Sequence, residues 1–395
     1  MKDWNRREFI AKPLAFMAAS QVLGKAGLLH AATAPAPIHR TLGKTGLSLP
    51  VVSMGVMNAN MPAVVRRAYE MGIRHFDTAA VYQNGRNEEM LGTVIKDLGV
   101  RDKVVIATKT HILAARRRAP EVKAEMRSIF EGSLKRLQMD HVDILYFHNL
   151  DNADDVALEA PLEAMMAFKK EGKARFLGVS THSNAAQVLQ AATRLGAHDV
   201  VLVGLNYTMA DDAALHTAIA TAAKRGIGIV AMKTQAGGTA KPSSKLPGTL
   251  PACSQTALLK WVLANPHIAT AIPGFTNFDQ LEQNFSVTAN LSYTTEEKAF
   301  LGDKATVAQA EFCRQCGQCR EDCPRQVDIP GLMRTHMYAV QYGNREHARL
   351  TLALAAPHAL AACSGCVTCR ATCRNAVNIA RKIDELKELA PVLLG

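Results

Sequence analysis

The sequence predicts an α/β fold, a (β/α)8 TIM barrel followed by a small, mainly α-helical domain. Eight short apolar runs rich in β-branched residues recur between residues 49 and 274, and amphipathic stretches lie between them. Near-continuous apolar strands that alternate with helices indicate a parallel sheet covered on both faces. Eight such repeats in roughly 260 residues suit a closed barrel better than an open sheet. Behind them, eight of the nine cysteines crowd into residues 313–373, which marks the second domain.

The expected strands follow one another at regular spacing. They are LPVVSMGV (49–56), GIRHFDTA (72–79), KVVIATK (103–109), VDILYFH (142–148), ARFLGVS (174–180), VVLVGLN (200–206), GIGIVAMK (226–233) and IATAIPG (268–274). Between them, stretches such as 124–138 and 160–173 carry apolar residues at helical spacing. The segment RTLGKTGLSLP (40–50), just before the first strand, predicts a hairpin that plugs the floor of the barrel.

The N-terminus predicts an export signal rather than part of the fold. Arg6 and Arg7 precede a mildly apolar stretch, and the alanine-rich HAATAPAP (30–37) closes it, an order that resembles a twin-arginine (Tat) signal peptide. Lys12 and Pro13 interrupt the stretch, so no membrane span and no integral membrane protein are expected. The resemblance implies export of a folded protein to the periplasm. The alternative is a cytoplasmic protein whose Arg-Arg pair is incidental.

These observations divide the chain into a signal peptide (1–34), a barrel (38–300) and a cysteine-rich domain (301–395). The net charge of +11 is dispersed, without a basic run interleaved with aromatic residues. Because nucleic-acid binding needs a concentrated basic surface, no nucleic-acid partner is expected.

Polar residues stand at the ends of three consecutive expected strands. Asp77 ends the second strand and Tyr82 lies five residues later, Lys109 ends the third strand, and His148 ends the fourth. Catalytic groups of such barrels come from the carboxyl ends of the strands, so these four side chains are expected to meet at one mouth.

Around these positions, HFDTAAVYQNGRNEEMLG (75–92), VIATKT (105–110), ILYFHN (144–149) and FLGVSTHSN (176–184) resemble the aldo-keto reductase family. The similarity covers about residues 38 to 290. That family uses a tetrad of Asp, Tyr, Lys and His, which falls on Asp77, Tyr82, Lys109 and His148. The resemblance implies hydride transfer between a small carbonyl or alcohol and a nicotinamide.

The chemistry requires these residue types. Hydride reaches the carbonyl carbon while a proton reaches the developing alkoxide, and a tyrosine with a pKa of about 10 is a weak acid for that task. Lys109 is expected to lower the pKa of Tyr82, and Asp77 to hold Lys109 charged and in place. His148 is expected to donate a hydrogen bond that orients the substrate oxygen.

The cofactor contacts follow from the resemblance alone. The segment IPGFTNFDQLEQN (272–284) resembles the family's loop and helix for the adenosine end of NADP(H). The implied contacts are Ser180 and Asn206 to the nicotinamide amide, and Thr276, Gln280, Gln283 and Asn284 to the adenosine end. Thr276 and Asn277 stand where many members carry an arginine for the 2′-phosphate, so NAD(H) stays open beside NADP(H).

The cysteines predict two [4Fe–4S] clusters. Cys313, Cys316, Cys319 and Cys323, followed by Pro324, match the bacterial ferredoxin spacing C-x2-C-x2-C-x3-C-P. The spacing returns at Cys363, Cys366, Cys369 and Cys373, with arginine in place of proline.

In two-cluster ferredoxins the fourth cysteine of each run serves the other cluster. That rule gives one set of Cys313, Cys316, Cys319 and Cys373, and another of Cys323, Cys363, Cys366 and Cys369. Zinc and disulfides remain alternatives. Cys253 stands apart and is expected to be a packed small side chain.

Residues 328–354 and 380–394 carry apolar residues at helical spacing. The C-terminal part resembles the α-helical ferredoxin-like modules of larger oxidoreductases, including a subgroup of aldo-keto reductases with such an extension. The resemblance implies electron transfer, with a redox partner protein, or a structural role for the clusters. The alternative from another functional class is an electron-transfer subunit whose barrel binds nicotinamide without turning over carbonyls.

Overall fold

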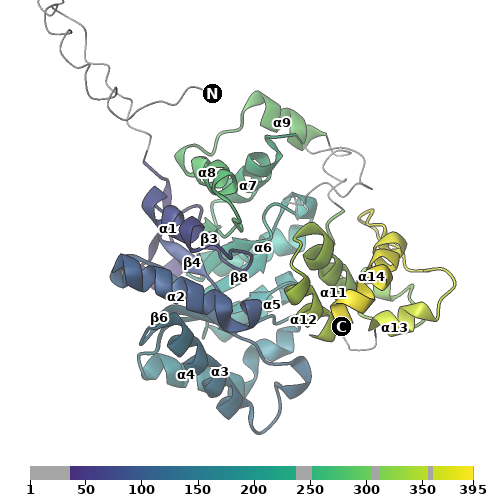
Figure 1. Cartoon of the computed structure of the whole chain (residues 1–395), viewed down its shortest axis with the longest axis horizontal. Coiled ribbons are helices and arrows are strands. Elements are labelled where there is room, and N and C mark those ends of the chain that lie inside the picture. The colour runs from purple at the N-terminus through teal and green to yellow at the C-terminus, as the bar shows by residue number, and fades with distance from the viewer. Residues whose placement is uncertain (1–35, 237–250, 304–310, 355–358, 395) are drawn as a thin grey trace, which may run out of the picture. The chain divides into compact units, whose positions relative to one another are not determined.

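The computed structural model describes residues 36–236, 251–303, 311–354 and 359–394, and Figure 1 shows their arrangement. The expected signal peptide at 1–34 lies outside these residues. The main element is an eight-stranded parallel sheet in the order β10-β9-β8-β7-β6-β5-β4-β3. Two isolated parallel bridges, Val52 to Ala271 and Gly55 to Gly274, join its first and last strands. In the described part of the chain, no helix has the length and apolar character needed to cross a bilayer.

Six of the eight strands fall inside the predicted apolar runs and two extend one residue beyond theirs, so the predicted barrel is confirmed. The strands are β3 (Met54–Gly55), β4 (His75–Asp77), β5 (Val105–Thr110), β6 (Val142–Phe147), β7 (Ala174–Thr181), β8 (Val200–Gly204), β9 (Gly228–Met232) and β10 (Thr270–Ala271). β6, β8 and β9 are buried along their whole length, as expected of parallel strands with both faces covered.

Helices follow the strands and cover the sheet (Figure 1). They are α1 (Pro62–Met71), α2 (Arg86–Leu98), α3 (Val122–Leu137), α4 (Glu159–Lys170), α5 (Ala185–Leu195), α6 (Ala213–Lys224), α7 (Ser254–Ala264), α8 (Phe278–Ser286) and α9 (Thr295–Gly302). In α3, the residues Met126, Phe130 and Leu134 recur every four positions and form its buried face. Phe130 packs against Phe168 of α4, with ring centroids 4.9 Å apart. The helical spacing of the apolar residues therefore predicts which face of α3 is buried.

The predicted plug is confirmed. Strands β1 (His39–Thr41) and β2 (Ser48–Pro50) form an antiparallel hairpin, and Leu42 and Leu49 are fully buried in the barrel interior. Gly43 has φ +52, and a Cβ there would lie 2.3 Å from the backbone nitrogen of Gly228, where β9 begins. Only glycine fits this close approach, so the hairpin closes the amino-terminal end of the strands.

The C-terminal part is helical, as predicted, but in shorter pieces. It contains α11 (Ile329–His336), a π-helical turn (Met337–Gln341), α12 (Arg345–Leu354), α13 (Ala359–Ser364) and α14 (Ile379–Leu394). Asp328 caps α11 by accepting from the Gly331 amide at 3.1 Å, and the chain turns at Gly343 with φ +63 before α12. Residues from Ala36 onward form one unit, so these helices pack on the barrel.

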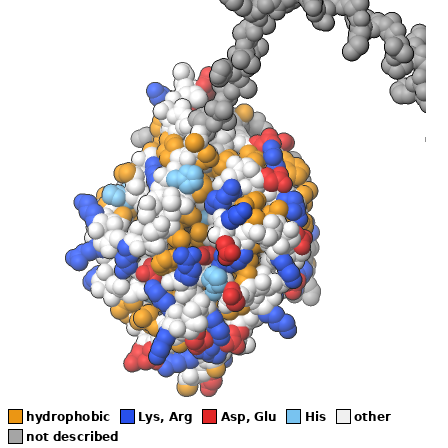
Figure 2. All heavy atoms as spheres, turned by 90° about the vertical axis from the view of Figure 1, so that its left-hand side faces the viewer, with side chains coloured by type: hydrophobic (Ala, Val, Ile, Leu, Met, Phe, Trp, Pro, Cys, Tyr) orange, Lys and Arg blue, Asp and Glu red, His pale blue; other side chains and the backbone are white. Residues whose placement is uncertain are grey.

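The surface carries charges of both signs. In the face drawn in Figure 2, Lys and Arg side chains are interspersed with Asp and Glu. Several pair across helices, such as Arg127 with Glu171 and Lys173 with Glu131.

Candidate active site

The four tetrad candidates lie together at the carboxyl ends of the strands. Asp77 is the last residue of β4, Tyr82 opens the short 3-10 turn Tyr82–Gly85, Lys109 lies near the end of β5, and His148 directly follows β6. All four are at least nine-tenths buried. The parallel sheet places consecutive strand ends side by side, which is why residues 71 positions apart meet.

Lys109 is the centre of this group. Its ammonium group donates to the Asp77 carboxylate and, at 2.6 Å, to the Thr78 carbonyl oxygen. It lies 5.0 Å from the centre of the Tyr82 ring. Burial lowers the pKa of Lys109, and contact with Asp77 opposes that shift. Asp77 thus anchors the lysine beside the tyrosine.

The structure corrects the expectation that Lys109 lowers the pKa of Tyr82. Burial raises that pKa well above its ordinary value, and Asp77 and Tyr338 raise it further. The physical reason is that burial disfavours the charged phenolate, and the Asp77 carboxylate that contacts Lys109 offsets part of the ammonium charge. Tyr82 is therefore a protonated phenol, the form that donates a proton.

His148 lies across the ring of Tyr82, with centroids 6.1 Å apart and planes at 85°. Burial lowers its pKa well below the ordinary value, and His111 and Lys109 add to the shift. Its Nδ1 is buried without a hydrogen-bond partner among the described residues. A neutral imidazole has one N–H to donate, which suits it to orient a carbonyl oxygen.

A cavity of about 140 Å³ extends from Asp77 and Tyr82 to Thr276 of the last βα loop and Gln280 of α8. The hydroxyl of Thr234, a residue that lines this cavity, is buried with no hydrogen-bond partner among the described residues. Buried polar groups normally have partners, so this hydroxyl marks a place for a polar ligand. The lining of the cavity therefore runs from the tetrad residues Asp77 and Tyr82 to the segment predicted to bind the adenosine end of a nicotinamide.

Of the six predicted cofactor contacts, Thr276 and Gln280 line this cavity and four do not. The Ser180 hydroxyl accepts from the Asn149 amide at 2.9 Å, and Asn206 accepts from the Thr208 hydroxyl at 2.7 Å. Gln283 donates to Ala252 at 2.9 Å and Asn284 to Gln280 at 2.7 Å. The protein itself thus supplies partners for these four side chains, and their cofactor contacts stay predictions.

The C-terminal part supplies residues that the sequence analysis missed. Tyr338, Gln341 and Tyr342 line the same cavity as Asp77 and Tyr82. His347 packs against Tyr82 with ring centroids 5.6 Å apart. They meet Lys233, which follows β9 and donates a 2.9 Å hydrogen bond to the Tyr338 hydroxyl. A polar residue directly after the seventh barrel strand was a readable signal for Lys233. The π-helical turn carrying Tyr338 had no such signal, although such turns are frequent at functional sites.

The eight clustered cysteines fall into two groups. Cys313, Cys316, Cys319 and Cys373 line one pocket, and Cys323, Cys363, Cys366 and Cys369 line another. Burial, together with the neighbouring cysteines, raises the pKa of Cys313 to about 12 and that of Cys363 to about 11. Such thiols ionise when a bound metal stabilises the thiolate. Four thiols per pocket are the donor set of a [4Fe–4S] cluster. Within the described ranges, no three His, Cys, Asp or Glu side chains are placed to share a single metal ion, so the two groups are defined by the pockets that they line.

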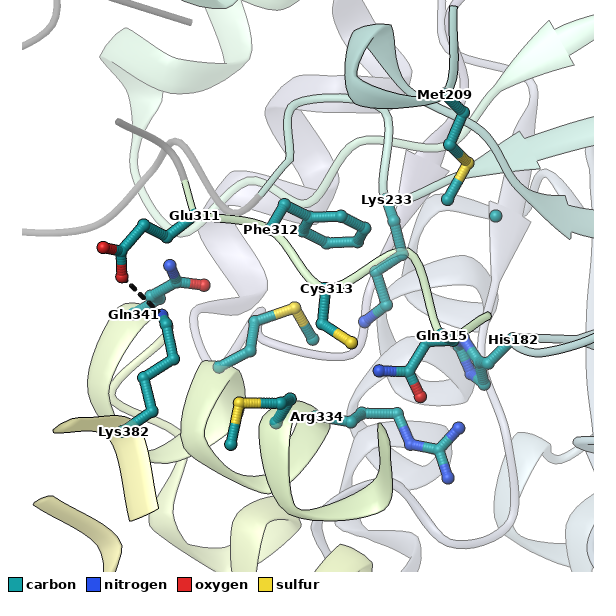
Figure 3. A pocket seen from close by; sticks show the side chains of 13 residues that line it. His182, Met209, Lys233, Glu311, Phe312, Cys313, Gln315, Arg334, Gln341 and Lys382 are labelled. Carbon is teal, nitrogen blue, oxygen red and sulfur yellow. Dashed lines mark ion pairs between the residues drawn. The ribbon is translucent and has the colours of Figure 1, made fainter. Parts of the chain in front are cut away.

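Cys313 lies beside the barrel mouth. It shares a cavity of about 20 Å³ with Lys233 and His182, and that volume holds about one water molecule. Figure 3 shows the Lys233 ammonium group and the Cys313 thiol facing this space, with Gln315 beside them. Lys233 and His182 also line the larger cavity at the tetrad. At this point the space between the described residues of the first cysteine group and the candidate nicotinamide site is therefore narrow.

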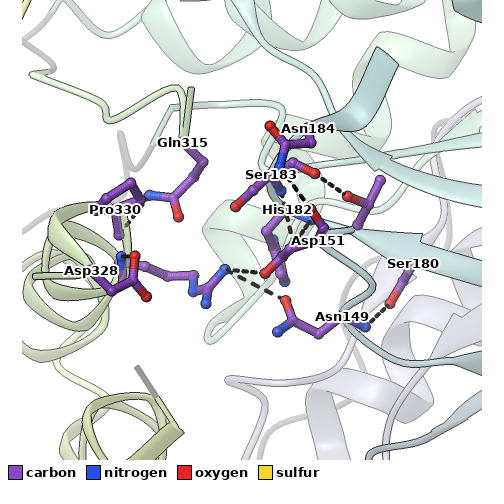
Figure 4. A network of polar contacts seen from close by, with 12 residues as sticks. Asn149, Asp151, Ser180, His182, Ser183, Asn184, Gln315, Asp328 and Pro330 are labelled. Carbon is purple, nitrogen blue, oxygen red and sulfur yellow. Dashed lines mark hydrogen bonds and ion pairs between the residues drawn. The ribbon is translucent and has the colours of Figure 1, made fainter. Parts of the chain in front are cut away.

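A polar network connects α11 to the loops of the barrel (Figure 4). The Asp151 carboxylate accepts from the backbone amide of Ser183 at 3.0 Å and pairs with Arg334 of α11 at 3.7 Å. Nearby, Arg314 pairs with Asp211 at 2.7 Å. The segment around Cys313 is therefore fixed to the ends of β6, β7 and β8.

The barrel and the C-terminal part each match a known protein family. A model of the Aldo/keto reductase family matches residues 55–252, half of the chain, and a 4Fe-4S dicluster domain matches residues 312–378. L-Galactose dehydrogenase of Arabidopsis thaliana is 28% identical over 306 residues, which are 69% of this chain and 92% of the plant protein.

Two solved structures resemble the fold. An aldo-keto reductase from Bacillus halodurans in its holo form matches with a TM-score of 0.57 and 22% identity, over 68% of this chain and 96% of its own. A putative aldo-keto reductase from Pseudomonas aeruginosa matches with a TM-score of 0.51 and 24% identity, over 64% and 95%. Each match covers nearly all of the other protein and about two thirds of this one. The chain therefore belongs to the aldo/keto reductase family of oxidoreductases and carries a 4Fe-4S dicluster domain in its C-terminal part.

Proposed function

We propose that the chain interconverts a carbonyl and an alcohol by hydride transfer with a nicotinamide, NADP(H) being the expected form. The observation that carries this proposal is the buried group of Tyr82, Lys109, Asp77 and His148 at one end of the cavity that reaches Thr276. Four residue types with complementary roles, brought together from three strand ends, have little structural purpose if no carbonyl is turned over.

Each side chain has one task. Tyr82, protonated at rest, donates its proton to the alkoxide oxygen in reduction and receives it in oxidation. Lys109, held by Asp77, stabilises the phenolate that remains. Neutral His148 donates its N–H to the carbonyl oxygen and turns the carbon toward the cavity. A bound nicotinamide supplies or accepts the hydride.

The C-terminal cysteines are proposed to hold two [4Fe–4S] clusters in the crossed sets, Cys313, Cys316, Cys319 and Cys373, and Cys323, Cys363, Cys366 and Cys369. The grouping of these thiols around two pockets supports the proposal. The position of Cys313 next to Lys233 supports electron transfer between the barrel and the C-terminal part, with a redox partner protein as the outlet. When bound, clusters pass electrons singly, whereas a hydride carries two.

Export remains part of the proposal. The Arg6-Arg7 pair and the following segment support passage through the Tat route to the periplasm. This route carries folded proteins, so both clusters and the nicotinamide would be acquired before export.

The decisive experiment is carbonyl turnover by Tyr82→Phe. Anaerobically purified protein is assayed on a panel of aldehydes and ketones with NADPH and NADH. We expect a loss of 10²-fold or more in kcat, because the proton donor is removed, with nicotinamide affinity unchanged. Tyr69→Phe, on the outer helix α1, is the control. Near-native turnover by Tyr82→Phe would contradict the proposal.

Electron transfer is tested separately. NADPH is added to the anaerobic protein, and EPR spectra are recorded for reduced clusters. A cluster signal supports transfer. If no signal appears with either nicotinamide, with or without a carbonyl or an alcohol, the clusters are structural.

A further inference from the structure

We propose that His347 of α12 contacts the substrate, so that the C-terminal part forms one wall of the carbonyl site. This inference rests on the proposed function and deepens it by naming a substrate class: small carbonyl compounds with a hydroxyl group on the carbon next to the carbonyl.

The first argument is the position of His347 relative to Tyr82. Among the residues that the structure describes, the Tyr82 ring has two imidazole neighbours, His148 from the barrel at 6.1 Å and His347 from α12 at 5.6 Å, both edge to face. Tyr82 carries the proposed proton donor, so both imidazoles stand beside the residue that a substrate has to approach. His148 serves the reacting oxygen, which leaves His347 to contact the neighbouring part of the substrate.

The second argument is that His347 is held in place. Its ring stands perpendicular to that of Tyr338, with centroids 4.4 Å apart. Its backbone amide donates to the Asn344 side chain at 2.9 Å, and Asn344 donates to Asn58 of the barrel at 2.8 Å. A side chain fixed at both its ring and its backbone is suited to a specific contact.

The helix that carries His347 is also tied directly to the segment after Tyr82. Glu346 pairs with Arg86 at 2.7 Å, and Arg86 begins α2 immediately after the turn that Tyr82 opens. The position of His347 relative to Tyr82 is therefore set by the protein and does not depend on the substrate.

The third argument is the chemistry of the ring. Its Nδ1 is buried with no hydrogen-bond partner among the described residues. Burial, with Lys233, Arg334, His111 and Lys109 nearby, lowers the pKa of His347 to about 3, so the imidazole is neutral. A neutral imidazole both donates and accepts, which matches a hydroxyl group. A site built to hydrogen-bond a hydroxyl discriminates against an analogue that lacks it.

The test compares two aldehydes of similar size, glycolaldehyde and propionaldehyde, which differ by a hydroxyl in place of a methyl group. We expect the wild-type chain to favour glycolaldehyde in kcat/KM. In His347→Ala, we expect the ratio of the two values to fall on the order of tenfold, with nicotinamide affinity unchanged. His347→Asn, which restores a hydrogen-bonding group, should recover part of the ratio. His141→Ala, just before β6 at the opposite end of the barrel, is the matched control.

A ratio that stays within twofold of wild type in His347→Ala overturns the proposal. The proposal is also overturned if the wild type prefers glyoxylate to glycolaldehyde and His347→Ala leaves that preference unchanged. The cationic side chains near His347, and not its imidazole, would then select the substrate.

Iron content and melting temperature are measured for each variant. If His347→Ala does not retain iron, His347→Leu replaces it, since leucine fills similar space without a hydrogen-bonding group. Wild-type turnover by Tyr82→Phe would refute the proposed function. An inactive Tyr82→Phe with an unchanged ratio in His347→Ala refutes only the role of His347.

Discussion

Lys233, directly after β9, donates a 2.9 Å hydrogen bond to the hydroxyl of Tyr338, 105 residues further along the chain. The same ammonium group lies 4.4 Å from the centre of the Tyr338 ring and 5.2 Å from that of Tyr342. A barrel strand end and a π-helical turn of the C-terminal part thus share one cation at the active-site cavity. The C-terminal part is built into the mouth of the barrel.

Tyr338→Phe keeps the ring over Lys233 and removes only its hydroxyl. We expect residues 337–347 to exchange backbone hydrogens about fivefold faster, because a hydrogen bond of about 1 kcal/mol that fixes this segment is lost. Hydrogen–deuterium exchange measured by mass spectrometry checks this. Tyr342→Phe leaves the Lys233–Tyr338 bond in place and should exchange like the wild type. Equal exchange rates in all three proteins would show that the bond does not hold the segment.

Asp77→Asn should impair both stability and turnover. It leaves the ammonium group of Lys109 buried without its counter-charge, and removing one partner of a buried ion pair typically costs about 3–5 kcal/mol. Urea unfolding measures that loss, and the pH–rate profile should shift because the pKa of Lys109 falls further. Asp97→Asn breaks an exposed pair with Arg66 at 3.8 Å and should change stability by under about 0.5 kcal/mol. Similar losses in both variants would count against an anchoring role for Asp77.

Crossed ligation makes a prediction about which cysteine variants behave alike. Cys373→Ser should damage the same cluster as Cys319→Ser, and Cys323→Ser the same cluster as Cys363→Ser, because these pairs line the same pockets. Each variant should retain about four of eight irons, and the EPR spectra should match within a pair. Cys253→Ser, at the start of α7, should retain all iron. Spectra that instead pair Cys373→Ser with Cys363→Ser would show ligation within each run.

The buried His75 is expected to make the stability of the barrel fall at acidic pH. It is fully buried at the start of β4, and burial, with Lys109 nearby, lowers its pKa to about 4, while Asp143 opposes the shift. The unfolded chain therefore takes up this proton first as the pH falls below about 6.5, and stability is lost between about pH 6.5 and 4. The slope from one such group is at most about 1.4 kcal/mol per pH unit. His75→Leu should reduce the dependence of the unfolding free energy on pH, measured by urea unfolding at several pH values. An unchanged slope would show that His75 does not carry the acid sensitivity.

The sequence was informative wherever a local pattern fixes structure. Apolar runs located the eight strands, and polar residues at their ends located Asp77, Lys109 and His148, because a parallel barrel brings those ends together. The cysteine spacing implied two crossed groups, and the thiols gather in those groups around two pockets.

What the sequence did not reveal depends on contacts between distant segments. No periodicity indicates that His347 packs on Tyr82, because docking is set by surfaces that exist only after both parts have folded. The pKa of Tyr82 was misjudged for a related reason. Residue types indicated a lysine held by Asp77 beside the phenol, but not the burial of the ring, which raises the pKa of Tyr82.

The segment between Cys323 and Cys363 has a consequence for the substrate site. It carries α11, the π-helical turn and α12, and its two end cysteines line one pocket. With both on one cluster, as proposed, iron would join the two ends of the segment that carries Tyr338 and His347. Loss of that cluster would free one end of the segment, so it would weaken the wall that His347 adds beside Tyr82 and with it the proposed choice of substrate.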